Sequence, residues 1–113
     1  MGSYVPDRGD VVWLTFDPQA GHEQAGRRPA FVVSPRSYNQ KVGLFIACPI
    51  TSKVKGYPFE VSITTKSGIN GVILADQIKS LDWKARNAER VEAASQAVVD
   101  AVIARILPLI GEE

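Results

Sequence analysis

Residues that bind metals or form disulfides are nearly absent from this sequence. One cysteine, Cys48, and one histidine, His22, occur among its 113 residues. A single cysteine excludes an intramolecular disulfide, and the apolar neighbours of Cys48 predict a buried, inert thiol. No paired spacing of metal ligands is present, so we expect neither a metal site nor a cofactor. His22 lies in a polar loop, and we interpret it as a solvated residue rather than a catalytic base.

Long apolar segments and targeting signals are also lacking. No apolar run approaches the ~20 residues that cross a bilayer, and no basic start followed by an apolar segment indicates a secretory signal. The phosphate-binding P-loop and the glycine motif of dinucleotide-binding folds are missing. Hydrophobic residues make up 45% and charged residues 22% of the chain, as in ordinary globular proteins. We therefore expect one cytoplasmic domain over residues 1–113, without membrane contact.

Acidic residues are missing from the middle of the chain. Between Gln24 and Phe59 there is no Asp or Glu, whereas the basic residues there are Arg27, Arg28, Arg36, Lys41, Lys53 and Lys55. The whole chain has a net charge of only +1, because acidic residues predominate in residues 1–23 and 87–113. A cationic segment in a nearly neutral protein indicates a local site for an anionic partner. The alternative is a set of scattered surface charges.

Short apolar segments bounded by turn residues predict a mainly β protein. The expected strands cover residues 9–16, 30–34, 44–50, 59–64, 72–76 and 78–83, with an edge strand within 84–91. Residues 36–41 predict one short helical turn. Pro49 is expected to cause a bulge or to end its strand, because proline cannot donate a hydrogen bond to a neighbouring strand.

Only the C-terminal segment has the periodicity of an amphipathic helix. Apolar residues from Val98 to Leu107 recur at spacings of three and four, which places them on one helical face. Ser95 is the expected N-cap, and Pro108 is expected to end the helix near Leu107 or to kink it. Several short strands followed by one helix predict a small, curled antiparallel barrel with a C-terminal helix.

The remaining candidate chemistry involves arginine and hydroxyl side chains. Arg28 ends a long polar loop just before a predicted strand, and Thr51 follows the end of another. If the two strands are neighbours, Arg28 and Thr51 face one pocket, where a guanidinium binds phosphate and stabilises developing charge. In the structural alternative, Arg28 pairs with Glu23 or Asp17 and Thr51 caps a turn.

Several sequence blocks, in order along the chain, resemble the MazF/PemK toxin family, and most closely its MazF branch. These blocks are Tyr4–Trp13, Phe16–Pro18, Gly21–Ala30, Val33–Pro35, Cys48–Ser52, Lys55–Val61 and Asp76–Arg86. Their shared order and spacing, rather than any single block, make the resemblance specific.

The resemblance implies a small SH3-like barrel of the CcdB/MazF type that forms a homodimer. It implies the toxin of a bacterial type II toxin–antitoxin system, acting as a sequence-specific, metal-independent endoribonuclease. Such enzymes cut single-stranded mRNA, leave 2′,3′-cyclic phosphate and 5′-hydroxyl ends, and so inhibit translation. The implied partner is a MazE-like antitoxin whose acidic, disordered segment blocks the RNA groove.

The resemblance also implies roles for individual residues. It assigns catalysis to Arg28 and Thr51, with Glu23 in support. Beside these, the charge and chemistry of the residues, rather than the family motif, make Arg27, Ser52, Lys53, Lys55, Tyr57, Gln77 and Lys79 the expected substrate-binding residues. The RNA 2′-hydroxyl serves as nucleophile, so no protein nucleophile is required, and the group that accepts its proton stays open. Tyr57 or Phe16 is the candidate for stacking on a base.

Two alternatives use the same fold without RNA cleavage. One is a non-enzymatic toxin of the CcdB type, which inhibits DNA gyrase by binding it. The other is an inactive relative that binds only RNA or antitoxin. A fold alone does not separate these functions, because function depends on the site.

Overall fold

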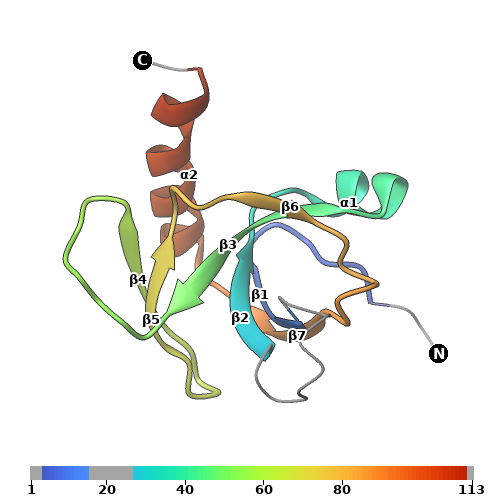
Figure 1. Ribbon diagram of the computed structural model, residues 1–113, viewed down its shortest axis with the longest axis horizontal. Helices are drawn as coiled ribbons and strands as arrows, with labels where there is room; N and C mark the ends of the chain where they lie inside the picture. The colour runs from blue at the N-terminus through green and yellow to red at the C-terminus, as the bar shows by residue number, and fades with distance from the viewer. Residues whose placement is uncertain (1–3, 16–26, 112–113) are drawn as a thin grey trace.

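The computed structural model describes residues 4–15 and 27–111, and within them the chain forms seven strands and two helices (Figure 1). The strands are β1 (Asp10–Thr15), β2 (Arg27–Val32), β3 (Phe45–Thr51), β4 (Glu60–Thr64), β5 (Asn70–Leu74), β6 (Lys79–Leu81) and β7 (Glu89–Ala93). The helices are α1 (Arg36–Val42) and α2 (Gln96–Ile110). The predicted strands, the short helical segment and the terminal helix are therefore confirmed as elements.

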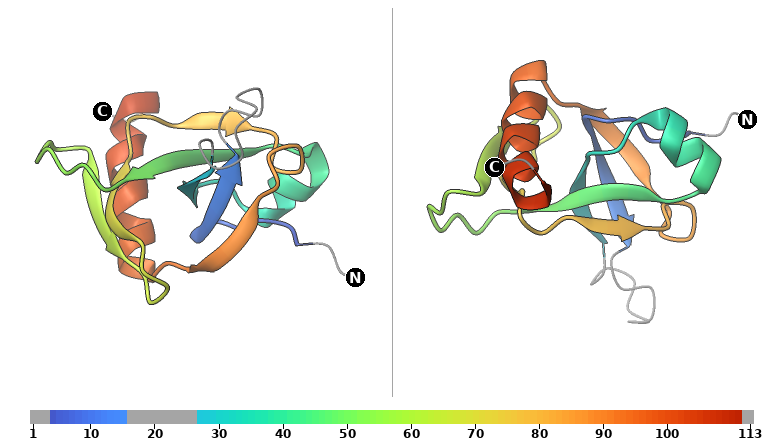
Figure 2. Two further views of the ribbon diagram at one scale, coloured as in Figure 1. Left: turned by 60° about the horizontal axis from the view of Figure 1, so that its bottom comes forward. Right: turned by 90° about the horizontal axis from the view of Figure 1, so that it is seen from above.

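Strand β3 is the centre of the sheet because it pairs with three other strands. It pairs with β2 along one edge, and along its other edge with β6 near its start and β5 at its end. The strand order is β4-β5-β3-β2-β1-β7, with β6 beside β3, and the pairs are antiparallel. The sheet curls where β3 changes partners, as both views of Figure 2 show. The expected mainly β, curled antiparallel fold with a C-terminal helix is confirmed.

Two hydrophobic clusters cover opposite faces of the central strands. Successive strand residues point to opposite faces, so Val11 and Val12 belong to different clusters. The Val11 cluster packs against α2, whose Val99, Val102 and Ile106 are buried in it. The Val12 cluster includes Phe45 of β3 and Trp83. The cores therefore hold β2 and β3, the strands whose ends form the site described below.

The prediction that Pro49 ends or bulges its strand is wrong. Pro49 lies within β3 and pairs in register with Ala30 of β2. On the other edge of β3, pairing with β6 ends at Ala47 and pairing with β5 begins at Ile50. On this edge, Pro49 therefore pairs with neither β5 nor β6, and its missing N–H disrupts neither of these two ladders.

The C-terminal helix begins as predicted but ends later. The Ser95 hydroxyl accepts a hydrogen bond from the backbone N–H of Val98 at 3.3 Å, which confirms the N-cap. Pro108 does not end the helix, which continues to Ile110. Proline removes a single backbone donor, and the loss is tolerated here in the last turn.

Two further outcomes concern the last edge strand and the thiol. The edge strand expected within 84–91 begins later, at Glu89, because residues 84–87 form turns. Cys48 is buried, as predicted. Burial, together with the nearby negative charge of Asp76, raises the pKa of its thiol to about 12.

Candidate active site

The neighbouring ends of β2 and β3 bring Arg28 and Thr51 together. Ala30 of β2 pairs with Pro49 of β3, and Arg28 and Thr51 each lie two residues from this last pair, so they belong to the same face as Ala30 and Pro49. Opposed residues of paired strands point to the same face of a sheet. Both residues line one cleft with a volume of about 350 Å³. The guanidinium and the hydroxyl are thus available to the same ligand.

We call this feature the Arg28 cleft. Its lining residues come from the ends of β2 and β3 and from the β4–β5 turn: Arg27, Arg28, Pro29, Ile50, Thr51, Ser52, Lys53, Gly68, Ile69 and Asn70. Arg28, Ser52 and Lys53 are exposed, whereas Thr51 is half-buried. The cleft therefore combines accessible cations with one hydroxyl held more firmly by its surroundings.

A second hollow, of about 200 Å³, adjoins the first at Thr51 and Lys53. We call it the Tyr57 pocket. It is lined by Thr51, Lys53, Lys55, Tyr57, Glu60, Leu74 and Gln77. Tyr57 and Leu74 give it apolar surface beside the amide of Gln77. The two hollows together offer cations next to an aromatic ring, a combination typical of surfaces that bind single-stranded nucleic acids.

The position of Thr51 is fixed by local backbone structure. Its hydroxyl oxygen accepts a hydrogen bond from the backbone N–H of Lys53 at 3.1 Å, so Thr51 caps a turn while it lines the cleft. Strand β5 approaches the backbone of Thr51 closely at Gly71. A Cβ atom on Gly71 would lie only 2.1 Å from the carbonyl oxygen of Thr51. Only glycine at position 71 allows β5 to support Thr51 at this distance.

Arg27 and Arg28 are adjacent in sequence but have different surroundings. The Arg27 guanidinium donates to the Thr15 hydroxyl at 3.0 Å and forms an ion pair with Glu89 at 2.6 Å. It also donates to the backbone carbonyls of Arg86 and Asn87, at 3.3 and 3.0 Å. Arg27 therefore joins β2 to β1 and to the segment before β7, and its predicted role in substrate binding stays a prediction.

Tyr57 is held by a carboxylate outside its own loop. Its hydroxyl donates to Asp76, with oxygen–oxygen distances of 2.9 and 3.2 Å to the two carboxylate oxygens. This hydrogen bond, and to a smaller extent desolvation, raises the pKa of Tyr57 above its ordinary value. The hydroxyl therefore stays protonated, and its hydrogen bond keeps the ring at the pocket wall.

The other predicted residues fall into two groups. Lys55 and Gln77 line the Tyr57 pocket, whereas Lys79 lies in β6 opposite Ala47 and lines neither hollow. Glu23, His22 and Phe16 lie outside the described residues.

Sequence reasoning missed the structural roles of Gly71, Glu60 and Asp76. Gly71 belongs to a turn pattern and Glu60 to the block Lys55–Val61, but neither pattern indicates the contact with Thr51 or with the loop. Asp76 stands in a block that resembles the toxin family, yet no role was assigned to it.

The described residues include neither a cluster of metal ligands nor a membrane-spanning helix. Residues 4–15 and 27–111 contain no group of three or more His, Cys, Asp or Glu side chains arranged to hold a metal ion. Neither helix in these ranges has the length and hydropathy required to cross a membrane.

Fold and cleft together define a class: a small protein with a curled antiparallel sheet, a C-terminal helix and a basic cleft at the strand ends. A family model described as "PemK-like, MazF-like toxin of type II toxin-antitoxin system" matches residues 7–110. The chain belongs to this toxin family, and the resemblance seen in the sequence is confirmed.

Individual relatives match over nearly the full length of the chain. The Endoribonuclease toxin MazF of Escherichia coli (strain K12) is 47% identical over 111 residues, which cover 98% of this chain and 99% of the relative. A crystal structure of MazF from Deinococcus radiodurans is 53% identical, with a TM-score of 0.86 and coverage of 97% and 100%. A MazE-MazF crystal structure from the same organism is 46% identical, with a TM-score of 0.86 and coverage of 98% and 100%. These relatives do not favour the alternative of a gyrase-binding toxin.

Proposed function

We propose that this protein is an endoribonuclease toxin of a type II toxin–antitoxin system that cuts single-stranded mRNA at specific sequences without a metal ion. The single observation that carries this proposal is the shared cleft of Arg28 and Thr51. The endoribonuclease names of the full-length relatives support it. Cleavage of mRNA inhibits translation and implies action in the cytoplasm.

The proposed reaction uses the RNA itself as nucleophile. The 2′-oxygen forms a bond to the adjacent phosphorus, the bond from phosphorus to the 5′-oxygen breaks, and the products carry a 2′,3′-cyclic phosphate and a 5′-hydroxyl. The 2′-hydroxyl loses a proton and the departing 5′-oxygen gains one. The protein has to align these atoms and stabilise the negative charge of the transition state.

Arg28 and Thr51 are suited to those two tasks. The Arg28 guanidinium is proposed to bind the scissile phosphate and to stabilise its developing negative charge. The Thr51 hydroxyl hydrogen-bonds a non-bridging phosphate oxygen or the 2′-hydroxyl. Glu23 is proposed to support them from the loop before β2.

The surrounding residues are proposed to bind the rest of the RNA. Lys53, Lys55 and Lys79 contact successive phosphates, and Arg27 and Ser52 assist near the scissile phosphate. In the Tyr57 pocket, the Tyr57 ring stacks on a base and Gln77 hydrogen-bonds a base edge. Stacking on aromatic side chains accepts any base, whereas amide hydrogen bonds distinguish bases.

The proposed assembly is a homodimer with a MazE-like antitoxin as its protein partner. MazE-MazF complexes among the structural relatives support this partner. An acidic, disordered antitoxin segment has the charge required to compete with RNA for a cleft that contains Arg28, Lys53 and Lys55.

The decisive test is cleavage of a mixed-sequence RNA in excess EDTA. We expect the wild-type protein to produce discrete fragments, Arg28→Ala to produce none, and Lys41→Ala to behave like the wild type. Lys41 is an exposed cation on α1, away from the cleft, so its variant controls for the loss of one charge. Wild-type protein that leaves RNA intact under these conditions refutes the proposal.

A further inference from the structure

The segment between β3 and β4, residues 52–59, has no regular secondary structure but supplies much of the proposed RNA-binding surface. Lys53, Lys55 and Tyr57 of this segment all line the Tyr57 pocket. Loops without internal hydrogen-bond ladders are usually the mobile parts of a protein. The order of this loop therefore depends on contacts with residues outside it.

The first such contact is made by Glu60, at the start of β4. One of its carboxylate oxygens accepts the backbone N–H of Lys55 at 3.0 Å, and the other accepts that of Gly56 at 2.9 Å. Gly56 has a φ of +82°, a left-handed conformation that glycine adopts without strain. Both oxygens of Glu60 are therefore directed at the loop backbone.

Two more contacts reach the loop from other elements. Asp76, just after β5, accepts the hydrogen bond from the Tyr57 hydroxyl. Arg105 of α2 donates from its Nε atom to the carbonyl oxygen of Pro58 at 3.1 Å. These contacts, two of them through carboxylates, add to the hydrogen bonds that the Lys53 N–H donates to the Thr51 hydroxyl and that the Ala75 N–H donates to the Phe59 carbonyl.

We infer that Glu60 and Asp76 are positioning residues, which hold residues 52–59 in the RNA-binding conformation before RNA arrives. The inference rests on the proposed ribonuclease function. Both carboxylates act through other groups, Glu60 through the loop backbone and Asp76 through Tyr57. A loop that is already ordered loses little conformational entropy on binding, so RNA binds more tightly.

The direction of the change in KM distinguishes a carboxylate that positions the loop from one that only repels RNA. RNA is a polyanion, and a carboxylate beside its binding site repels it. Removal of such a carboxylate would by itself strengthen binding and lower KM. Removal of a positioning carboxylate raises KM, because the loop must then be ordered during binding.

The test compares Glu60→Ala and Asp76→Ala with Asp100→Ala on a single-stranded RNA that carries one mapped cut site. Asp100 is a solvent-exposed carboxylate of α2, so its variant makes the same change in net charge. We expect KM to rise roughly 3- to 10-fold in both loop variants, the equivalent of about one hydrogen bond, with kcat unchanged. For Asp100→Ala we expect KM to fall or stay the same. Unchanged or lower KM values in the two loop variants would overturn the inference.

Conservative variants at the second contact keep the test valid if a truncation unfolds the protein. Tyr57→Phe keeps the ring and removes only the hydroxyl, so it breaks the same hydrogen bond as Asp76→Ala. The two changes should therefore raise KM by no more together than separately. Asp76→Asn retains an acceptor oxygen and should restore KM. Additive effects, or failure of Asp76→Asn to restore KM, would contradict a role exerted through Tyr57.

Amide hydrogen exchange tests the Glu60 contact without any RNA. The backbone amides of Lys55 and Gly56 should exchange faster in Glu60→Ala than in the wild type, and no faster in Asp100→Ala. Unchanged exchange in Glu60→Ala refutes the positioning role. Failure of the wild-type protein to cut RNA refutes the proposed function alone, so the two failures are distinguishable.

Discussion

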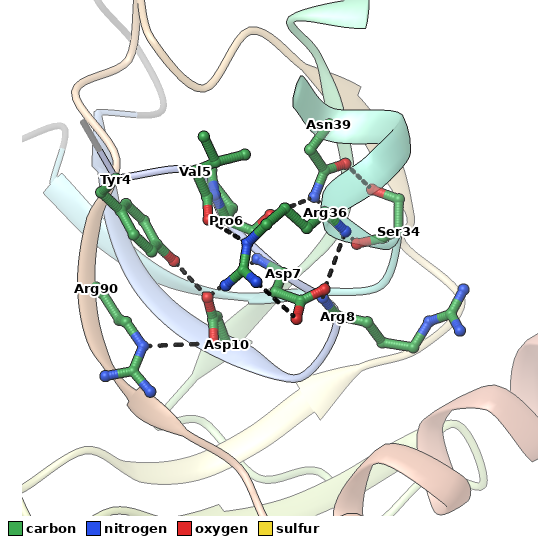
Figure 3. Close-up of polar contacts among 10 residues, drawn as sticks. All are labelled: Tyr4, Val5, Pro6, Asp7, Arg8, Asp10, Ser34, Arg36, Asn39 and Arg90. Atoms are coloured by element: carbon green, nitrogen blue, oxygen red, sulfur yellow. Dashed lines mark hydrogen bonds and ion pairs between the residues drawn. The ribbon is translucent and has the colours of Figure 1, made fainter. Parts of the chain in front are cut away.

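Two groups of polar residues in this protein have opposite surroundings. Near the N-terminus, Figure 3 shows a cluster in which the polar groups face one another. The fully buried amide of Asn39 donates to Pro6 O at 2.8 Å and Ser34 O at 3.0 Å, and its oxygen accepts the Ser34 hydroxyl at 2.6 Å. Asp10, with only 5% of its surface exposed, accepts the Tyr4 hydroxyl at 2.6 Å. These residues complete one another's hydrogen bonds.

The Arg28 cleft presents the reverse situation. Arg28 is exposed, and its guanidinium has no hydrogen bond or ion pair with any other residue that the structure describes. Across those same residues, no buried side-chain nitrogen or oxygen lacks a partner. Buried polar groups must be paired because desolvation is costly, whereas groups open to solvent remain available to a ligand. The comparison predicts that changes in the N-terminal cluster alter stability and changes in the cleft alter activity.

The largest effect is expected for Arg28→Ala. Loss of a charge that stabilises the transition state should lower kcat/KM by about 10²–10³-fold, as for other preorganised groups of this kind. The melting temperature should stay at the wild-type value, because the side chain is exposed. Kinetics on a single-site RNA and a thermal melt of the same sample check both statements. A lower melting temperature would place Arg28 among the structural residues.

Asn39→Ala is the corresponding change in the N-terminal cluster. It leaves the Ser34 hydroxyl proton without an acceptor, although the Ser34 oxygen still accepts from the Ile46 N–H, and it removes the donor to the Pro6 carbonyl. These losses in a buried site should cost about 2–4 kcal/mol of unfolding free energy. Urea unfolding measures this loss, with the exposed Asn70→Ala as control, for which we expect a change below about 0.5 kcal/mol. The specific activity of the folded fraction should be unchanged. Lower activity in fully folded protein would link the cluster to the cleft.

Thr51 both caps a turn and lines the Arg28 cleft. Thr51→Val tests whether its hydroxyl matters more for stability or for activity. Valine keeps the shape and removes the hydroxyl that accepts from Lys53 N–H and faces the cleft. A hydrogen bond to a charged phosphate is worth more than one to an exposed backbone amide, so activity should fall roughly 10- to 100-fold. The protein should remain folded by circular dichroism. Unfolding with little change in the activity of the folded protein would show that Thr51 is structural.

The fold was predictable where the signal was local. The apolar run that forms β3 and the periodic apolar residues of α2 each determine their element from nearby sequence. The place of Pro49 within β3 was not predictable, because it depends on where this strand changes from β6 to β5. Such pairing is a property of the whole sheet, and no short stretch of sequence encodes it.

The candidate site was predictable to a similar extent. Arg28 and Thr51 follow from strand ends and from the family resemblance. The partners of Arg27 and Tyr57 do not, since Glu89 lies 62 residues from Arg27 and Asp76 lies 19 residues from Tyr57. Contacts between residues so far apart require the register of several strands, which the sequence patterns do not determine.

Gly71→Ala should moderately lower both the stability and the activity of the protein. The new Cβ would lie 2.1 Å from the Thr51 carbonyl oxygen, so β5 and β3 must separate. Forced separation of packed backbone should cost about 1–3 kcal/mol of stability and displace Thr51, with loss of activity. Gly43→Ala is a useful control, because its Cβ would meet nothing within 4 Å while its left-handed φ of +82° still strains alanine. Equal activity in the two variants would show that the close approach at Thr51 is unimportant.

The smallest effect concerns the salt dependence of RNA binding, and it distinguishes Arg27 from Lys53. Each phosphate neutralised on a single strand contributes about −0.7 to the slope of log K against log salt concentration. Lys53→Ala should therefore make the slope shallower by about 0.7. Arg27→Ala should change it less, because the Arg27 guanidinium already forms an ion pair with Glu89 at 2.6 Å. Fluorescence anisotropy with a cleavage-resistant 2′-deoxy oligonucleotide at several salt concentrations measures both slopes. An equal reduction of the slope in the two variants would mean that Arg27 exchanges Glu89 for a phosphate when RNA binds. Arg27 would then be an RNA-binding residue of the Arg28 cleft, like Lys53.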